Sequence, residues 1–103
     1  MKEINFLEKY FNEIKSLISP NLENIKKLIL AKNIIIDARK SKNKILIFGN
    51  GGSAAIASHF SVDLTKNAKV RCVNFNEADL ITCFSNDYGY EKWIEKAVKY
   101  YGN

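Results

Sequence analysis

The first forty residues carry two apolar stripes with the spacing of helices. In the first stripe, apolar side chains recur at three- and four-residue steps, which predicts one amphipathic helix. Its members are Ile4, Leu7, Phe11, Ile14 and Ile18. Ser19 and Pro20 interrupt the stripe, and serine before proline predicts an N-cap followed by proline at the first helical position. A second helix is therefore expected from about Pro20 to Lys40, with an inner side formed by Leu22, Ile25, Leu28, Ile29 and Ile36.

The pattern changes from helical to strand-like at Lys44. An unbroken apolar run from Lys44 to Phe48 predicts a short strand that is buried on both faces. Glycines follow at positions 49, 51 and 52, and a segment rich in small residues then predicts a helix from Ser53 to about Thr65. A strand, a tight loop and a helix are thus expected in direct succession.

The rest of the chain predicts a second strand and two more helices. Val70 to Phe75 alternates between apolar and polar residues as a half-buried strand does, and Asn76 is expected to cap a helix from Glu77 to about Phe84. Ser85 to Tyr90 is expected to be a loop, and Glu91 to Tyr101 a last amphipathic helix. A strand, a crossover helix and a strand form a parallel unit, so the predicted fold class is α/β, a doubly wound parallel sheet preceded by two helices.

Length and composition are those of one globular domain. The chain has 103 residues, of which 47% are hydrophobic and 26% are charged, which excludes disordered and membrane-spanning classes. Every apolar run is far shorter than the ~20 residues of a spanning helix, and Met1 leads into a charged amphipathic segment instead of a signal peptide. A cytoplasmic location without a membrane partner is expected. Cys72 and Cys83 are not part of a metal-binding or redox motif, so both are expected to be buried thiols.

The net charge of +5 raises the question of nucleic acid. The lysines are scattered along every predicted helix with acids among them, and no basic stripe or interleaved aromatic pattern is visible. This distribution favours a solvated surface over a nucleic-acid interface. It would still attract an acidic substrate.

Candidate chemistry begins at the loop Gly49-Asn50-Gly51-Gly52-Ser53. Glycines allow positive φ and a close approach of backbone N–H groups to a ligand, and Ser53 can cap the following helix and offer a hydroxyl. A helix N-terminus favours an anion, and phosphate above all. The loop lacks the third glycine of the dinucleotide pattern and the lysine of the Walker pattern. A small phosphorylated ligand is therefore favoured, although glycines between a strand and a helix are often only a turn.

His59 and Asp63 are the second candidate pair. They are four residues apart in a predicted helix, so both side chains leave from one face. Imidazole and carboxylate together suit zinc or a similar divalent metal, whereas the alternative for such a pair is a local hydrogen bond or ion pair. The residues by themselves leave both interpretations open.

These motifs resemble a known family. Gly49-Asn50-Gly51-Gly52-Ser53-Ala54-Ala55, His59-Phe60 and the acid Asp63 are similar to the sugar isomerase (SIS) domain of bacterial phosphoheptose isomerases. The segment Ser85-Asn86-Asp87-Tyr88-Gly89-Tyr90 resembles the second signature of the same family. The likeness covers about the N-terminal half of such a domain, divided here into an oligomerising helical pair at 1–41 and a partial SIS domain at 42–103.

The resemblance implies roles for individual residues. Asn50, Gly51, Gly52 and Ser53 would hold phosphate or adjacent hydroxyls, and Asp87 would contact the sugar, although its loop also suits a helix C-terminal turn. His59 and Asp63 would hold a divalent metal such as zinc, with Asp63 also the catalytic base. The family more often has Glu where this chain has Asp63, which favours metal binding over proton abstraction.

The reaction implied by the resemblance interconverts ketose and aldose phosphates, such as sedoheptulose 7-phosphate and a heptose 7-phosphate. The family also implies a homotetramer with a helical core, whereas packing of the helices within one chain is the plainer alternative. The family's late Gln/His helix is absent from the sequence, so a truncated or otherwise completed domain is expected. A non-catalytic phosphosugar-binding or regulatory module and an inert structural fragment are the competing functions.

Overall fold

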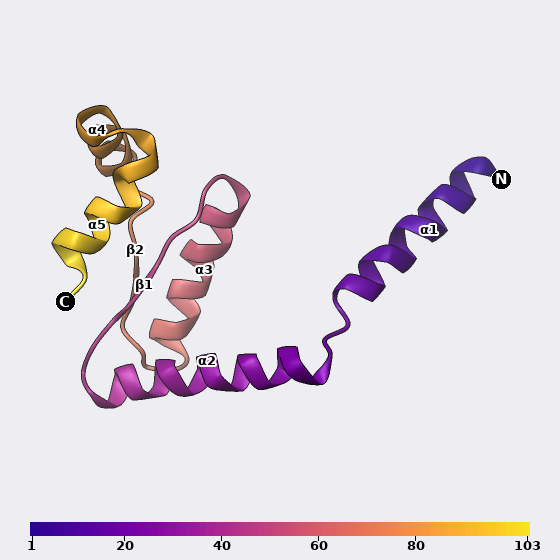
Figure 1. Ribbon diagram of the computed structural model, residues 1–103, viewed down its shortest axis with the longest axis horizontal. Helices are drawn as coiled ribbons and strands as arrows, with labels where there is room; N and C mark the ends of the chain where they lie inside the picture. The colour runs from indigo at the N-terminus through magenta and orange to yellow at the C-terminus, as the bar shows by residue number, and fades with distance from the viewer. The chain divides into compact units, whose positions relative to one another are not determined.

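In the computed structural model, which describes all of residues 1–103, the chain forms two compact units, Met1–Asn33 and Ile34–Asn103. The first unit contains helix α1 (Lys2–Leu17) and most of helix α2 (Leu22–Lys40), both labelled in Figure 1. Both expected helices are therefore present. No residue of either helix is buried, so their apolar stripes are uncovered in the single chain. The division into an oligomerising helical pair at 1–41 and a partial domain at 42–103 is not tested by these two units and stays a prediction.

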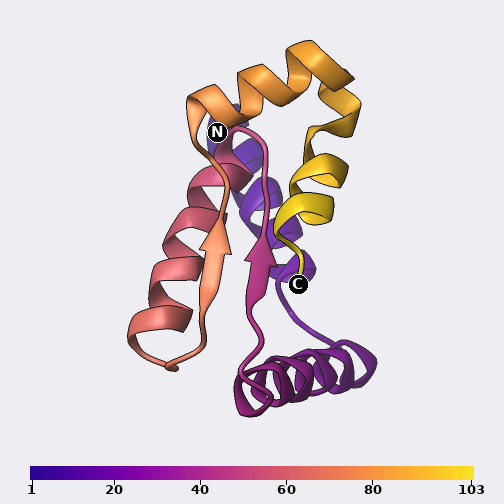
Figure 2. The same cartoon turned by 90° about the vertical axis from the view of Figure 1, so that its left-hand side faces the viewer.

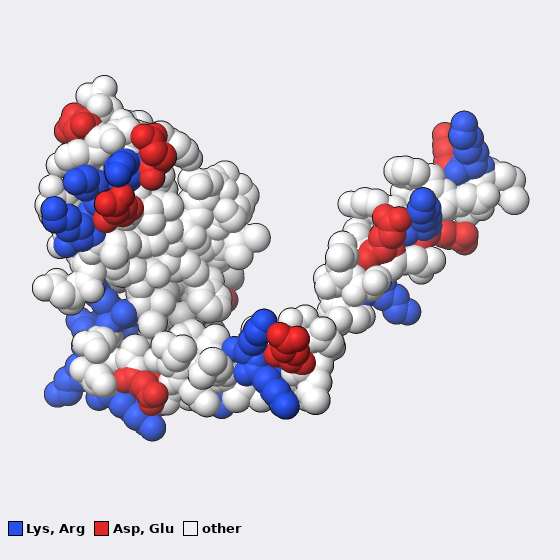
Figure 3. Space-filling model, in the orientation of Figure 1, with Lys and Arg blue, Asp and Glu red and all other residues white.

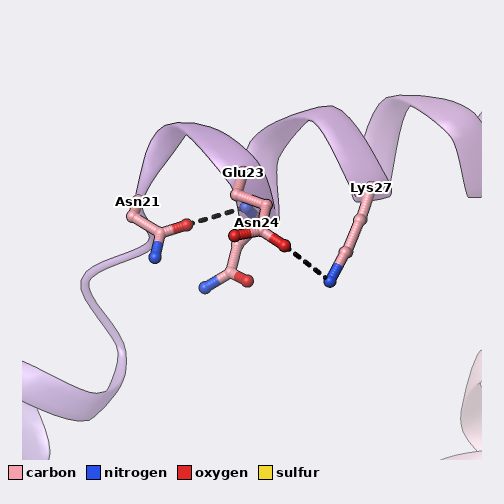
Figure 4. A network of polar contacts seen from close by, with 4 residues as sticks. All are labelled: Asn21, Glu23, Asn24 and Lys27. Carbon is pink, nitrogen blue, oxygen red and sulfur yellow. Dashed lines mark hydrogen bonds and ion pairs between the residues drawn. The ribbon is translucent and has the colours of Figure 1, made fainter.

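The predicted cap of α2 at Ser19 is wrong. The helix begins at Leu22, and the side-chain oxygen of Asn21 accepts a hydrogen bond of 2.8 Å from the backbone N–H of Asn24 (Figure 4). One turn of helix separates Glu23 from Lys27, and their ion pair of 3.0 Å adds to the first turns of α2. The Ser19 hydroxyl instead donates back to the Lys15 carbonyl at 2.7 Å, so it satisfies the end of α1.

The second unit is built on a strand–helix–strand succession. Strands β1 (Ile45–Ile47) and β2 (Cys72–Asn74) pair in parallel with Ile45 opposite Cys72, and helix α3 (Gly52–Lys66) connects them. Figure 2 shows the two strands side by side and pointing the same way. Figure 1 shows them nearly edge on, with α3 on one face and helix α5 (Trp93–Tyr101) on the other. The predicted parallel unit is confirmed, although both strands are shorter than expected. The expectation that the first strand is buried on both faces is wrong, because all three residues of β1 are only half-buried beside a single neighbouring strand.

Aromatic side chains make the core between the sheet and α5. Phe48 and Phe75, which follow the two strands, stack with ring centroids 5.5 Å apart. Trp93 meets Phe48 edge to face at 5.9 Å and is only 2% exposed. Ala97, one turn further along α5, is fully buried. The expected apolar face of the last helix is thus confirmed, because its bulky and small positions alternate against the sheet.

Helix α3 covers the opposite face with small residues. Ala57 and Ser61 are buried, while Ala54 and Ser58 are half-buried and Ala55 is exposed. Small side chains allow the helix axis to lie close to the strands, as expected for a segment of this composition.

Helix α4 (Ala78–Tyr88) corrects two further expectations. Asn76 does not cap it: the Asn76 amide donates to the Ala54 carbonyl at 2.8 Å and to the Ser58 hydroxyl at 2.7 Å, so its hydrogen bonds go to α3. Ser85 to Tyr88 is helical, not a loop, and the helix ends at Gly89 with φ +95°. A short 3₁₀ turn, η1 (Tyr90–Lys92), leads into α5.

The two cysteines differ in environment. Cys72 is buried as expected, and burial raises the pKa of its thiol. Cys83 is exposed on α4, so the expectation of a second buried thiol is wrong. None of the helices combines the length and the apolar character that a membrane span requires.

Candidate functional site

The glycine loop lies between the end of β1 and the start of α3. Gly51 immediately precedes the helix and has φ +55°, which only glycine adopts readily. A Cβ atom on Gly49 would lie 2.4 Å from the backbone of Ser53, whereas a Cβ on Gly52 would meet no heavy atom within 4 Å. Two of the three glycines are thus required by the fold of the loop, and Gly52 faces open space.

Hydrogen bonds between Asn50 and Ser53 close the loop. The Ser53 hydroxyl donates to the Asn50 carbonyl at 2.8 Å and accepts from the Asn50 N–H at 2.9 Å. Ser53 therefore lies inside the first turn, and its expected role as helix cap is wrong. The backbone N–H groups of Gly51 and Gly52 donate to no acceptor in the chain. Two free amides at a helix N-terminus form the arrangement that favours an anion.

The segment Ser85–Tyr90, the second motif of the sequence, contacts the glycine loop through Tyr90. The Tyr90 hydroxyl donates to the side-chain oxygen of Asn50 at 2.8 Å, which joins η1 to the loop. Sequence reasoning assigned no role to Tyr90, and its one signal was its position at the end of the second motif.

Asp87 is held within the last turns of α4. One of its carboxylate oxygens accepts a contact of 3.6 Å from the Cys83 thiol, and the other accepts from the Asn86 amide at 3.2 Å. The negative charge of Asp87, together with this contact, raises the pKa of the Cys83 thiol. The structure therefore places Asp87 in a helix C-terminal turn, the second of the two settings expected for it. It shows no contact between Asp87 and the residues of the glycine loop.

His59 and Asp63 share one face of α3, as predicted from their spacing. The Nε2 atom of His59 lies 3.4 Å from a carboxylate oxygen of Asp63, and their side chains are 81% and 46% exposed. The pair lies on the helix that starts at the glycine loop, about 9 and 15 Å of helical rise beyond Ser53.

The donor set of this pair fits a divalent metal only in part. Imidazole and carboxylate are good zinc ligands, but a protein zinc site takes three or four of them. No third His, Cys, Asp or Glu of this chain joins the two. The pair could supply two ligands, and the others would have to be water or groups from outside these 103 residues.

A polar layer fixes α3 beside β2. Asn74 donates to the Ser61 hydroxyl at 2.9 Å, and Asn76 bonds Ala54 and Ser58 as described above. The other side-chain atom of Asn76, its oxygen, is buried and has no partner. These contacts hold the start of α3, and hence the free amides of the loop, in a fixed position.

Comparison with known proteins identifies relatives along nearly the whole chain. The sequence profile described as "SIS domain" matches residues 9–100. A protein named phosphoheptose isomerase from Helicobacter pylori (strain P12) is 31% identical, and the match covers 96% of this chain and 55% of that protein. Phosphoheptose isomerase from Aliarcobacter butzleri is 36% identical over 67% of this chain and 40% of its own length. The chain thus spans about half the length of the curated relatives it matches. No solved structure gives a significant match.

Proposed function

The chain belongs to the SIS domain family, and we propose on that basis that it is the N-terminal part of a phosphosugar isomerase of the phosphoheptose type. The proposed reaction interconverts a ketose phosphate and an aldose phosphate, with sedoheptulose 7-phosphate and a heptose 7-phosphate as the pair. One observation carries the proposal. The free amides of Gly51 and Gly52 begin the same helix that presents His59 and Asp63 on one face.

Phosphate would bind at the loop. The amides of Gly51 and Gly52 are unpaired donors at the positive end of α3, and the open space at Gly52 leaves room for phosphate oxygens. Asn50 and Ser53 hold the loop in shape through their mutual hydrogen bonds, and the amide nitrogen of Asn50 remains for a sugar hydroxyl. His59 and Asp63 lie further along the same helix, and the sugar would extend from this loop toward them.

Asp63 is the proposed base. Isomerisation requires removal of a proton from the carbon beside the carbonyl, and its return to the neighbouring carbon. A partly exposed carboxylate accepts such a proton if the sugar lies across the face of α3. An acid that opens the sugar ring is also required, and His59, the single histidine of this sequence, is assigned to metal binding. The acid therefore comes from outside these 103 residues in this proposal.

His59 and Asp63 would also hold the metal, for which zinc is the proposed ion. When bound, the metal supplies polarisation of the carbonyl oxygen on which charge develops. The imidazole Nε2 and one carboxylate oxygen are already within 3.4 Å of each other, so little rearrangement of the two side chains is needed.

The remaining features of the proposal concern assembly and architecture. The uncovered apolar side chains of α1 and α2 support an oligomerising helical pair at 1–41, and a homotetramer is the assembly proposed. Residues 42–103 would form part of a doubly wound sheet, because two parallel strands with an open edge need further strands. A cytoplasmic location is proposed from the same family.

A non-catalytic phosphosugar-binding module is the second candidate. Asp63 is one methylene shorter than the Glu that the resemblance leads one to expect, and proton abstraction tolerates little displacement. Phosphate binding through the loop amides would be unaffected by that difference. Both candidate functions therefore use the glycine loop to bind phosphate. They differ in whether the protein turns over a substrate with Asp63 as the base.

Substitution of Asp63 distinguishes the two candidate functions. The variants are measured in a protein that contains this chain and has the full length of its relatives. An isomerase assay with zinc and sedoheptulose 7-phosphate should lose turnover with Asp63→Asn, while the affinity for the sugar phosphate is largely kept. Asp63→Glu should preserve or raise turnover, and Glu8→Gln on the exposed face of α1 is the matched control. If neither the parent nor Asp63→Glu turns over any sugar phosphate that it binds, the protein is a binding module.

A further inference from the structure

A cationic hollow lies at the opposite edge of the sheet from the glycine loop. Arg39, Lys42, Lys69 and Arg71, together with Asn43, line an open hollow of about 510 Å³. Lys42 precedes β1 and Lys69 precedes β2, whereas the glycine loop follows β1. Because the strands are parallel, their starts meet at one edge and their ends at the other (Figure 2). The hollow is therefore separate from the proposed sugar site.

Two arginines brace the turns that form the hollow. Arg39, in the last turn of α2, donates from Nη1 to the Ala68 carbonyl at 3.0 Å. Arg71, just before β2, donates from Nη2 to the Lys42 carbonyl. Each arginine thus fixes the turn on the other side of the hollow. A guanidinium has five N–H donors in a planar fork, so most donors of both side chains remain for a ligand.

The two lysines occupy backbone positions that favour glycine. Lys42 has φ +59° and Lys69 has φ +56°, and no other residue besides glycine has a positive φ. Lys42 follows the end of α2 in a pattern whose left-handed position is usually glycine, with the Asn43 N–H donating to the Ala38 carbonyl at 2.8 Å. At both positions a lysine is conformationally less favourable than a glycine. What the lysines add to the hollow is charge.

No carboxylate of the chain forms an ion pair with this cluster. None of the ion pairs in the structure includes Arg39, Lys42, Lys69 or Arg71. Figure 3 shows Lys and Arg side chains gathered where α2 ends, with an acidic group beside them. Asp37 is the acid nearest in sequence to Arg39, and it forms no ion pair.

The helix ends nearby account for part of the charge. Cations offset the partial negative charge of a helix C-terminus, which applies to Arg39 on α2 and to Lys69, whose ammonium donates to the Lys66 carbonyl at 2.9 Å. This effect does not account for Arg71, which lies at the start of a strand, or for Lys42 in a left-handed position.

We propose that the hollow binds a di- or triphosphate group of a small ligand. Two pre-oriented guanidinium forks and two ammonium groups match several adjacent phosphates, because arginine binds phosphate in a bidentate manner. The volume is in the range of small-ligand sites. The lining contains no aromatic side chain on which a base could stack, and the four cations line one hollow instead of the extended track that nucleic acid requires.

The test uses Lys42→Gly with Lys69→Gly, because glycine removes both charges and suits both backbone conformations. Calorimetric titration of the 103-residue chain with inorganic tripolyphosphate should give saturable binding. The double variant should weaken it roughly tenfold or more while its thermal midpoint stays equal or rises. The matched control, Lys26→Gln with Lys32→Gln on exposed positions of α2, removes the same charge and should change the affinity less than about twofold.

Two comparisons distinguish the source of the phosphates. Equal affinities for tripolyphosphate and ATP would show that the phosphate chain alone is bound, and tighter binding of ATP would show that a nucleoside contributes. Absence of saturable binding, or binding that the double glycine variant leaves intact, would overturn the proposal. So would binding of a DNA duplex that is weakened by the variant but not displaced by tripolyphosphate, because that result assigns the hollow to nucleic acid.

Discussion

The Tyr90 hydroxyl donates a hydrogen bond of 2.8 Å to the side-chain oxygen of Asn50, forty residues earlier in the chain. This contact joins the two motifs that characterise the sequence, because Asn50 belongs to the glycine loop and Tyr90 ends the second motif. It restrains the side chain of Asn50, the residue that precedes Gly51 and Gly52 in the loop. The second motif therefore contacts the glycine loop through Tyr90, and not through Asp87.

Tyr90→Phe tests this connection. Removal of an exposed hydroxyl should lower the free energy of unfolding by no more than about 1.5 kcal/mol, and loss of the fixed Asn50 orientation should weaken sugar-phosphate binding about three- to tenfold. Urea unfolding and calorimetric titration measure the two effects. Tyr88→Phe is the matched control. The Tyr88 hydroxyl pairs with the Tyr100 hydroxyl at a distance of 3.0 Å and forms no hydrogen bond with the glycine loop. Equal effects of both variants on affinity would contradict the assigned role of Tyr90.

The three glycines of the loop should differ in their tolerance to alanine. A Cβ on Gly49 would lie 2.4 Å from the Ser53 backbone, so Gly49→Ala should lower the free energy of unfolding by about 1–3 kcal/mol. Gly52→Ala is the control, because its Cβ meets nothing within 4 Å and alanine favours the first turn of a helix. Its free energy of unfolding should stay the same or rise. Urea unfolding that ranks the two variants in the reverse order would show that the loop has another conformation.

The thiol of Cys83 reports on the position of Asp87. The charge of Asp87 and its contact with the thiol raise the pKa of Cys83, so the reactive thiolate should form only at higher pH than in an unperturbed cysteine. Asp87→Asn removes the negative charge, which is the largest cause, so it should lower this pKa and speed alkylation by iodoacetamide at pH 8, with the difference vanishing above both pKa values. Peptide mass spectrometry measures the rate at Cys83 separately from the buried Cys72.

Asp79→Asn is the control for this experiment, since Asp79 makes the smallest of the contributions to the raised pKa of Cys83. Its effect on the alkylation rate should be clearly smaller than that of Asp87→Asn. Identical rates in the parent and Asp87→Asn would place the Asp87 carboxylate away from Cys83.

His59→Ala separates metal binding from stability. The His59–Asp63 pair is largely exposed, so its removal should change the free energy of unfolding by less than about 1 kcal/mol. Loss of one of two ligands should nevertheless weaken Zn²⁺ binding by roughly tenfold or more. Glu95→Gln is the control, because Glu95 forms a comparable exposed ion pair with Lys92 at 3.6 Å and lies outside the site. Unchanged Zn²⁺ affinity in His59→Ala would remove the pair from the metal site.

The sequence was informative where local periodicity decides the structure. The stripe of α1, the helical spacing of apolar residues in α2 and the short apolar run of β1 predicted these elements. The glycine loop was predicted between a strand and a helix, because several glycines after an apolar run allow the chain to turn.

Competition between alternative partners explains the errors. Ser19, Asn76 and Ser53 each had a side chain suited to cap a helix, but their bonds go to Lys15, to α3 and to Asn50 respectively. Contacts between residues far apart in the chain could not be predicted from local sequence patterns either. The lysines and arginines are scattered along the chain, and yet Arg39 reaches Ala68 and Arg71 reaches Lys42, each across 29 residues. These contacts help to bring the four cations of the hollow together.

The central claim is that phosphate binds at the free amides of Gly51 and Gly52, and backbone amide chemical shifts test it most directly. Titration of the ¹⁵N-labelled chain with sedoheptulose 7-phosphate should shift the amide signals of Gly51, Gly52 and Ser53 most, in a saturable manner. In Gly52→Val, whose side chain enters the open space at the loop, these shifts should disappear while the rest of the spectrum is kept. Signals that stay unmoved at millimolar ligand, or largest shifts around Lys42 and Lys69 instead, would contradict the claim.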